Sequence, residues 1–330
     1  MFDFGRLQII AIAAALLCLT PVLSGASTEL EIVILTILGA CLLIQTAHVL
    51  PFTPLWPKQT ATVAGPLDEA GALSILSCNV KQSNRDYQAV LSQVAAVEPD
   101  LAVFMEVDTG WVDALRQGFA GTYMRIECPM DNSYGMMLAC RLPVETYEIQ
   151  HRLNDHVPSI DAVIRLRNGA ALRVIALHPE PPVPTRDTEA RDAEILLVGQ
   201  EARRETRPMI VTGDLNDVAW SRTTRRFLRI SRLLDPRQGR GVYNSFDARF
   251  WFLRWPLDHI FHSHHFEIEE LRRLPFVGSD HFPMFYRLVF RGSVDNRMPS
   301  PATAADKAET DQVVAAEKQR DRPPVGEDWE

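Results

Sequence analysis

Cysteine is scarce and scattered in this 330-residue sequence. Cys18 and Cys41 lie in apolar stretches and Cys78 in a predicted core strand, so the chain lacks the cysteine framework of a small secreted domain. Cys128 and Cys140 could pair in an oxidising compartment, but two buried free thiols are the favoured interpretation. No group of Cys and His has the spacing of a zinc site, which excludes that class of metalloprotein.

Charge is almost absent from residues 1–50. Leu7–Leu23 and Ile32–Leu50 contain no Asp, Glu, Lys or Arg, and a polar link, Ser24–Glu31, separates them. Each apolar segment is about as long as the hydrocarbon core of a bilayer requires, roughly 17 to 25 residues. We therefore expect two transmembrane helices at 1–50, a hairpin with both ends on the same side of the membrane.

The few charges around the hairpin indicate its orientation. Glu29 and Glu31 lie in the link, whereas Arg6 and Lys58 flank the two spans, so the positive-inside tendency favours a cytoplasmic catalytic domain. An alternative is a signal peptide at residues 1–26 with the small-residue site Ser24-Gly25-Ala26, which would leave one span. Leu38-Gly39-Ala40-Cys41 is also similar to a lipoprotein cleavage box, but the apolar run continues past Cys41 and a mid-span cysteine is favoured.

Large apolar side chains are nearly absent from the last part of the chain. Residues 293–330 are polar and charged with some Pro and Ala, and we expect a disordered tail because so few apolar groups cannot drive folding. Residues 51–71 are predicted to be a linker, since Pro51–Pro57 carries three prolines that end the second helix. Trp56 in that segment suits the membrane–water interface.

Residues 72–292 differ from both ends, because runs typical of strands and of helices alternate there. No internal repeat is visible, and mixed strands and helices imply a layered α/β body. The predicted helices are Asp86–Val97, Arg186–Thr206 and Ser221–Leu234. The predicted strands are Leu73–Val80, Leu101–Met105, Tyr134–Cys140, Val144–Gln150, Ala162–Arg167, Leu172–Leu177, Met209–Thr212, Leu257–Phe261 and Phe282–Phe290.

Polar side chains recur where these predicted strands end. Because ligands of α/β sheets bind beyond the carboxyl ends of the strands, we expect these side chains to converge on one pocket. The residues are Asn79, Glu106, His178, Asp214, Asn216, Asp258, Asp280 and His281.

The oxygen atoms in this set suit magnesium. Mg²⁺ prefers oxygen ligands and keeps several of its waters. Glu106 supplies a carboxylate, and Asn79 and Asn216 supply amide oxygens without excess charge. The set therefore predicts a divalent-metal site.

The remaining side chains suit hydrolysis of a phosphoester. Asp214 could accept the proton of an attacking water. His281 and His178, with the metal, could stabilise the negative charge that gathers on the phosphoryl oxygens. Asp258 would orient His281 by a hydrogen bond to its far nitrogen and would raise its pKa.

In order along the chain, these residues resemble the endonuclease/exonuclease/phosphatase family. The motifs that carry the resemblance are Gly213-Asp214-Leu215-Asn216, Pro256-Leu257-Asp258-His259 and Ser279-Asp280-His281, and it covers residues 73–290. The family has a four-layer α/β sandwich. The apolar hairpin, Pro54–Pro57 and His178-Pro179 look like a membrane-anchored bacterial branch, which implies a multi-pass protein of the bacterial inner membrane.

The resemblance also implies roles for the residues and a cofactor. Mg²⁺, or Mn²⁺ in its place, would be bound by Glu106, Asn79 and Asp280. Asp214 would activate the water and His281 would be the catalytic histidine, with Asp258 as its carboxylate partner. Asn216 and His178 would bind the phosphate.

Three functions remain open. The substrate could be a nucleic acid, or it could be a lipid phosphate or pyrophosphate. The chain could also be a catalytically silent binding module, although Asp214, Asn216 and His281 are all present. Nuclease members carry an aromatic or acidic residue at the phosphate in mid-chain, for which Tyr134 is the nearest candidate. The aromatic stretch Phe246–Trp255 could stack bases, contact a bilayer or pack in the core.

Five arginines share one face of the predicted helix Ser221–Leu234. One interpretation is a solvated face paired with nearby acids, and the other is a basic surface for lipid headgroups or nucleic-acid phosphates. These residues are Arg222, Arg225, Arg226, Arg229 and Arg232.

Overall fold

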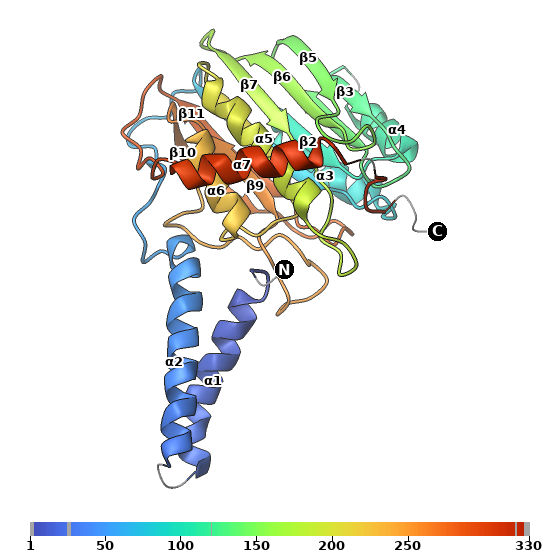
Figure 1. Ribbon diagram of the computed structural model, residues 1–330. Helices are drawn as coiled ribbons and strands as arrows, with labels where there is room; N and C mark the ends of the chain where they lie inside the picture. Colours follow the sequence, from blue (N-terminus) through green and yellow to red (C-terminus); the bar gives the residue numbers. More distant parts are fainter. Residues whose placement is uncertain (1–2, 25–27, 120, 321, 327–330) are drawn as a thin grey trace.

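The computed structural model describes residues 3–24, 28–119, 121–320 and 322–326. A helical hairpin, α1 and α2, projects from an α/β body that contains all the strands of the described chain (Figure 1). The small-residue site of the signal-peptide alternative lies partly outside the described residues, as does the middle of the link between the two apolar segments.

Two mixed sheets form the centre of the body. The first has the strand order β10-β11-β1-β2-β4-β3 and the second β5-β6-β7-β8-β9. The strands are β1 Ala72–Asn79, β2 Leu101–Met105, β3 Met124–Cys128, β4 Met136–Cys140, β5 Val144–Gln150, β6 Ser159–Arg165, β7 Ala171–Ala176, β8 Met209–Asp214, β9 Asp258–His262, β10 Phe266–Arg273 and β11 Met284–Phe290.

Helices cover the outer face of each sheet. On the first sheet, α3 (Tyr87–Val97) and α4 (Thr109–Gly118) pack against β1, β2 and β4. On the second, α5 (Glu189–Arg204) and α6 (Arg222–Ser231) pack against β7, β8 and β9. The inner faces of both sheets share one apolar core. This arrangement confirms the predicted four-layer α/β sandwich.

Strand β1 shows why these residues form this architecture. Side chains of a strand alternate between its two faces. Leu73 and Ile75 belong to the core between the sheets, whereas Leu76 and Cys78 belong to the core beneath α3 and α4. A strand that is covered on both faces is mainly apolar, so β1 and β2 could be predicted from the sequence.

The elements that were not predicted from the sequence lie at the edges of the sheets or on the surface. Strands β3 and β10 are the two edges of the first sheet, and β10 carries charged side chains at most of its positions. An edge strand exposed on one side has a weak alternating pattern, so the sequence signal was poor. Helix α4 is short and follows β2 closely.

The prediction of a disordered tail at 293–330 is wrong for α7, Ala304–Glu317. Thr303 and Asp306 form a capping box at its start, and Val314 packs into the apolar cluster of α5 and α6. Figure 1 shows α7 lying across these helices. Ionic contacts compensate for the small apolar surface, and composition alone does not reveal them.

These ionic contacts also decide between the two interpretations of the arginine face of α6. Asp306 pairs with Arg229 at 2.6 Å, and Glu309 pairs with Arg222 at 2.9 Å and with Arg226. The face is therefore mainly an ion-paired surface beneath α7.

Residues 51–71 join α2 to β1 and follow the surface of the body. Phe52, in a short 3-10 turn at Leu50–Phe52, is buried. Gln59 Oε1 accepts a 2.7 Å hydrogen bond from the Asp235 backbone, and Thr62 forms a β-bridge with Ile268.

Among the described residues, one helix is long and apolar enough to cross a membrane. It covers Glu29–Phe52, with α2 at Glu29–Val49, a mean hydropathy of 2.2 and only 6% of the apolar window buried. Helix α1, Arg6–Ser24, is apolar but falls short of that length. The structure thus supports one candidate span and does not support the multi-pass prediction. The apolar side chains of both helices are largely exposed, which is unusual for a surface facing water.

The body end of the hairpin is fixed to the sandwich. Val49 and Phe52 pack with Trp220 and Leu257 in a small apolar cluster. Trp220 Nε1 donates a 2.7 Å hydrogen bond to the carbonyl of Asp3. The residues just before α1 therefore lie against the body and not in the solvent.

Candidate active site

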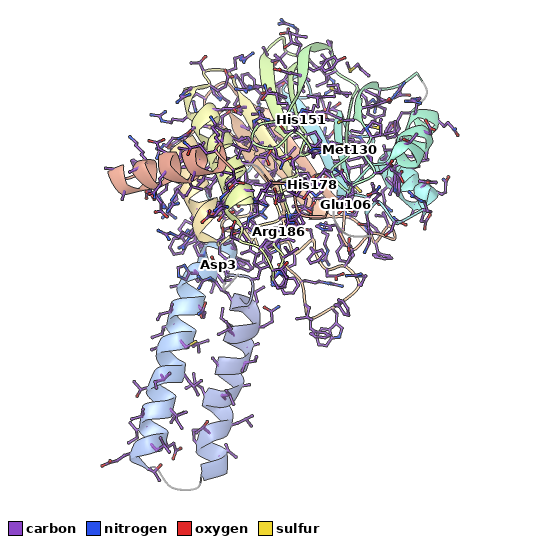
Figure 2. The ribbon with its side chains drawn as sticks, turned by 45° about the vertical axis from the view of Figure 1, so that its right-hand side comes forward. Asp3, Glu106, Met130, His151, His178 and Arg186 are labelled. Atoms are coloured by element: carbon purple, nitrogen blue, oxygen red, sulfur yellow. The ribbon has the colours of Figure 1, made fainter. Side chains whose placement is uncertain are left out.

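Strand pairing brings the predicted polar residues to one end of the two sheets. Asn79 ends β1 beside Met105, the residue before Glu106. In the second sheet Asp214 ends β8 directly opposite Asp258, the first residue of β9. Figure 2 shows Glu106 and His178 inside the body, above Asp3 at the body end of the hairpin.

Unusual backbone conformations help to orient the side chains of the site. Glu106 and Asn216 have left-handed backbones, with φ of +62° and +53°. Such conformations cost energy in non-glycine residues and cluster at functional sites. Gly213 has φ +139°, and a Cβ there would come within 2.0 Å of the Leu177 carbonyl oxygen. Only glycine lets β8 approach closely enough to place Asp214.

Asp214, His281 and Asp258 form a buried chain of acid, imidazole and acid. His281 Nδ1 lies 2.8 Å from Asp258 Oδ2, and its Nε2 lies 3.3 Å from Asp214 Oδ2. Burial would lower the pKa of His281, but the charges of Asp214 and Asp258 outweigh it and raise the pKa to about 10. His281 is therefore a cation at neutral pH.

Asp214 is held from several directions. Its Oδ1 accepts a 2.9 Å hydrogen bond from the Asn216 backbone, and its Oδ2 accepts one of 3.1 Å from Asn79 Nδ2. Burial raises the pKa of Asp214 above the ordinary value, against the opposing charge of His281. A carboxylate with a raised pKa is a stronger base than an exposed one.

His178 approaches the same carboxylate from the other side. Its Nε2 lies 3.9 Å from Asp214 Oδ2, and its Nδ1 is buried with no hydrogen-bond partner among the described residues. Burial lowers the pKa of His178, against the opposing charge of Asp214, and so favours the neutral imidazole. His178 lines the cavity beside Asp214, so its imidazole is placed to contact a bound ligand.

Glu106 is the best-placed metal ligand. Its Oε1 accepts a 2.8 Å hydrogen bond from Asn79 Nδ2, and its Oε2 accepts one of 3.1 Å from the Gln82 backbone. Burial raises the pKa of Glu106, against those hydrogen bonds, so a nearby cation would relieve an unfavourable buried charge. Within the described residues no cluster of three or more His, Cys, Asp or Glu has metal-binding geometry. One carboxylate with waters and substrate oxygens is nevertheless an ordinary Mg²⁺ environment.

Three residues that the sequence analysis singled out have partners that the sequence did not indicate. Asp280 forms a 2.7 Å ion pair with Lys81, at the edge of the site. Asn216 Nδ2 donates a 2.9 Å hydrogen bond to the carbonyl of Pro179. The hydroxyl of Tyr134 donates a 2.6 Å hydrogen bond to the carbonyl of Val325, and the Tyr134 ring lies 6.0 Å from His178.

Sequence reasoning missed several supporting residues. Ser279 Oγ donates to the Asn79 carbonyl at 2.7 Å and accepts from the His281 backbone at 3.0 Å, which fixes the loop that carries the histidine. The ring of Phe246 packs 4.8 Å from that of His281. Lys81 could have been found as a cation two residues beyond a strand-end polar residue, but Phe246 carries no such signal.

A cavity of about 610 Å³ opens onto these side chains. One part of its lining is polar and includes Glu106, Asp214, His281 and His178. The remainder is largely apolar and comes from distant parts of the chain, including Phe4, Trp255, Leu257 and Val325.

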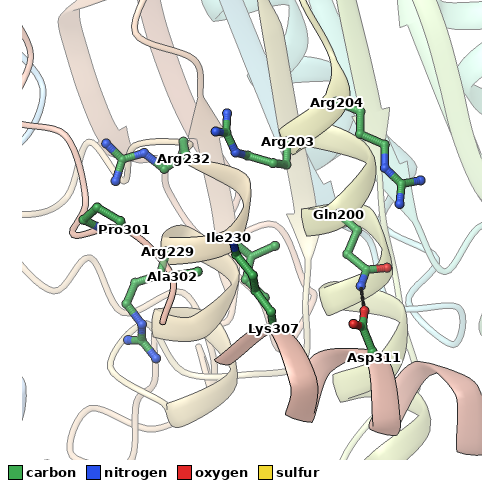
Figure 3. A pocket seen from close by; sticks show the side chains of 10 residues that line it. All are labelled: Gln200, Arg203, Arg204, Arg229, Ile230, Arg232, Pro301, Ala302, Lys307 and Asp311. Carbon is green, nitrogen blue, oxygen red and sulfur yellow. Dashed lines mark hydrogen bonds between the residues drawn. The ribbon is translucent and has the colours of Figure 1, made fainter. Parts of the chain in front are cut away.

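A second cavity of about 450 Å³ lies between α5, α6 and α7 (Figure 3). Its lining is mainly basic, with Arg203, Arg204, Arg229, Arg232 and Lys307, and Gln200 donates a 2.7 Å hydrogen bond to Asp311 there. This second cavity contains none of the predicted site residues, so the candidate active site is the first one.

The sequence is similar to a known protein family. Residues 76–281 match the model of a family described as the Endonuclease/Exonuclease/phosphatase family. The search of curated proteins found no match.

Solved structures of the same fold come from several organisms. D. rerio TDP2 complexed with single strand DNA product is 17% identical, covers 66% of this chain and 98% of its own, and has a TM-score of 0.56. The human Nocturnin catalytic domain with bound sulfate anion is 17% identical, with coverage of 68% and 96% and a TM-score of 0.53. A Bacteroides thetaiotaomicron mannosyl-6-phosphatase is 18% identical, with coverage of 66% and 100% and a TM-score of 0.51. At these identities the likeness establishes a shared fold.

Proposed function

Because the chain belongs to the endonuclease/exonuclease/phosphatase family, we propose that it is a divalent-metal-dependent hydrolase of phosphoester bonds. The observation that carries this proposal is the buried chain Asp214–His281–Asp258, of which Asp214 and His281 line the cavity. It pairs a proton acceptor with a histidine cation, and hydrolysis of a phosphoester needs both.

Proton transfer would begin at Asp214. Its buried carboxylate would accept a proton from the attacking water, and its raised pKa favours that transfer. The cationic His281 would donate Nε2–H to a phosphoryl oxygen that gains charge in the transition state. Asp258 would hold the ring and keep it charged, since its Oδ2 lies 2.8 Å from Nδ1.

The phosphate would lie between these residues and the metal side of the cavity. Glu106, with Asp280 nearby, would hold Mg²⁺, with Mn²⁺ as a substitute. Asn79 would hold Glu106 in place, because its Nδ2 donates to Glu106 and its Oδ1 accepts a 2.9 Å hydrogen bond from the Lys81 backbone. When bound, the cation would neutralise part of the charge on the phosphoryl oxygens. Asn216 and the neutral His178 would bind the phosphate, because both line the cavity beside Asp214.

The anchor would bring this chemistry to a membrane surface. Helix α1 packs along α2, and at about 1.5 Å per residue it would reach most of the way across a roughly 30 Å hydrocarbon core. We propose that both helices enter the bilayer, with the body on the cytoplasmic side. Reporter fusions after residue 326 should therefore show a cytoplasmic signal, and an external signal would reverse the orientation. The likeness to a membrane-anchored bacterial branch stays a prediction.

Hydrolysis by the full chain in detergent micelles tests the function. The panel would contain plasmid DNA, single-stranded DNA, RNA, p-nitrophenyl phosphate, phospholipids and lipid pyrophosphates, each with EDTA, Mg²⁺ or Mn²⁺. Metal-dependent hydrolysis of at least one substrate, absent in Asp214→Asn, is the expected result. Silence on the whole panel would instead favour the binding module.

A further inference from the structure

The cavity has the character of a site for a molecule that is charged at one end and apolar at the other. Its charged floor contains Glu106, Asp214 and His281. Its wall contains Phe4, Trp255 and Leu257, together with a run of apolar residues at 181–184. A free sugar phosphate or a nucleotide would leave that wall in contact with water.

The same lining argues against a polynucleotide. Among the described residues that line the cavity there is no Lys or Arg. Proteins that follow a nucleic-acid strand neutralise successive phosphates with such side chains, and their affinity depends on it. The lining itself therefore suits a single phosphate group, and the nearby Lys81 at the edge of the site is paired with Asp280.

Part of the apolar wall belongs to the hairpin. Phe4 lies two residues before α1, and its carbonyl accepts a 2.6 Å hydrogen bond from Trp255 Nε1. The rings of Phe4 and Trp255 lie 6.2 Å apart. The wall therefore continues from the active site to the start of the hairpin.

An aromatic loop lies beside this wall. The loop joins Phe246, whose ring touches His281, to Trp255, and it projects on the hairpin side of the body (Figure 1). At its tip Phe250, Trp251 and Phe252 are 44%, 82% and 57% exposed. Exposed aromatic side chains of this kind are typical of the membrane–water interface.

Two arginines lie in or near the aromatic loop. The guanidinium carbons of Arg254 and Arg273 lie 5.0 and 4.3 Å from the centre of the Phe282 ring. Burial lowers the pKa of Arg273, but its guanidinium group stays charged at neutral pH. Basic groups next to interfacial aromatics favour contact with anionic headgroups.

We propose that the substrate is a phosphorylated membrane lipid, which enters the cavity headgroup first from the bilayer that holds the hairpin. Its phosphate would bind above Asp214 and His281, its apolar part would lie along Phe4 and Trp255, and the loop 250–252 would contact the bilayer. This inference rests on the proposed hydrolase function and names its substrate class.

The test uses the full chain reconstituted in vesicles of phosphatidylcholine that contain phosphatidate or phosphatidylglycerol. Substrates in solution are dibutyryl phosphatidate, p-nitrophenyl phosphate and single-stranded DNA. We expect kcat/KM to rise at least about tenfold from dibutyryl to dioleoyl phosphatidate, because a buried apolar chain adds binding energy. If the enzyme cleaves diesters in place of monoesters, we expect it to cleave phosphatidylglycerol. A higher kcat/KM for DNA than for every lipid would overturn the inference while leaving the hydrolase function intact. Silence on all substrates would instead contradict the hydrolase function itself.

A second measurement does not depend on turnover. Brominated lipids placed in the vesicles should quench the tryptophan fluorescence of the protein, and Trp251→Phe should remove much of that quenching. The double variant Trp251→Ala/Phe252→Ala should lower vesicle hydrolysis by about tenfold. The control is Tyr147→Ala, since Tyr147 is a 55% exposed aromatic on β5, away from the hairpin (Figure 1). Equal effects of the loop and control variants on vesicle hydrolysis, with quenching unchanged in Trp251→Phe, would refute the contact with the bilayer.

Discussion

Asp258 binds His281 through one carboxylate oxygen, at 2.8 Å, while its other oxygen is buried with no hydrogen-bond partner among the described residues. The carboxylate is thus committed to the imidazole. The second charge near the ring is Asp214, 3.3 Å from Nε2. A phosphoryl oxygen that enters the site would compete with Asp214 for that proton, which would free Asp214 to act as a base.

Replacing either Asp214 or His281 should stop hydrolysis. We expect Asp214→Asn and His281→Ala to lower kcat/KM by about 10²- to 10⁴-fold, the usual contribution of general acid–base groups. Phosphate release at saturating Mg²⁺ measures the loss, and circular dichroism checks the fold. His264→Ala is the control, because His264 is exposed and outside the cavity. Turnover retained by either site variant would rule out the mechanism.

The pH profile should report the charge on His281. Activity that needs the cation is lost as pH rises through its pKa of about 10, and activity that needs ionised Asp214 is lost as pH falls through a pKa raised above its ordinary value. Asp258→Asn removes a charge that raises the pKa of His281. Its alkaline limb in kcat/KM should therefore move down by about one pH unit or more. An alkaline limb at the same pH in both proteins would show that Asp258 only positions the ring.

The same pKa shift has a consequence for stability. A histidine whose pKa is raised by folding stabilises the native state fully below its unfolded value near 6.5. That stabilisation is lost as pH rises through about 10. In unfolding scans, Asp258→Asn should therefore lose most stability, relative to the natural chain, near pH 6, and progressively less as pH rises toward 10.

Glu106→Gln should raise the metal requirement. The variant keeps the size of the side chain and can still bind hydrogen-bond donors, but it removes the buried negative charge next to Asn79. We expect the Mg²⁺ concentration for half-maximal activity to rise by about tenfold or more. Glu98→Gln, in an exposed residue, should leave the titration unchanged. Identical titrations for both variants would exclude Glu106 as a ligand.

Gly213→Ala should inactivate the enzyme by displacing Asp214, although it removes no catalytic side chain. A Cβ at residue 213 would come within 2.0 Å of the Leu177 carbonyl oxygen and would push Asp214 from its place. A shift of about 1 Å in a reacting group can cost roughly 100-fold in rate. Gly169→Ala is the matched control, since Gly169 also has positive φ, +88°, but nothing lies within 4 Å of its Cβ position. Equal activity in the two variants would contradict this account.

Glu194→Gln should stabilise the protein in alkaline solution. Glu194 is buried in α5, its Oε1 has no hydrogen-bond partner among the described residues, and burial raises its pKa to about 8. An acid whose pKa is raised by folding costs stability progressively as pH rises from its unfolded value, near 4.5, to about 8. The gain in free energy of unfolding should be small at pH 5 and a few kcal/mol at pH 9. Glu148→Gln, in an exposed residue of β5, is the control.

The sequence predicted best what depends on local pattern. Strands β2 and β5 matched their predicted bounds, because continuous apolar or alternating residues are bounded there by Pro, Asp and turn residues. The polar residues at strand ends could be placed in one site because strand ends meet at one edge of a sheet.

Other features depend on contacts between distant residues. The ion pair of Asp306 with Arg229 joins segments that share no local pattern, so α7 was missed. Phe4 lines the active-site cavity only because Trp255 holds it there, 251 residues further along the chain. No periodicity within either segment indicates that contact.

The cavity draws its wall from both terminal regions, Phe4 near one end and Val325 near the other. A shortened enzyme made from residues 72–292 alone would keep every predicted catalytic side chain and still lack part of the surface that selects its substrate. Affinity tags or proteolytic trimming near residue 4 or residue 326 would therefore change the lining of the cavity, as a mutation of a lining residue would. Preparations that differ only in how their ends were engineered should then be compared as different enzymes, with separate substrate preferences.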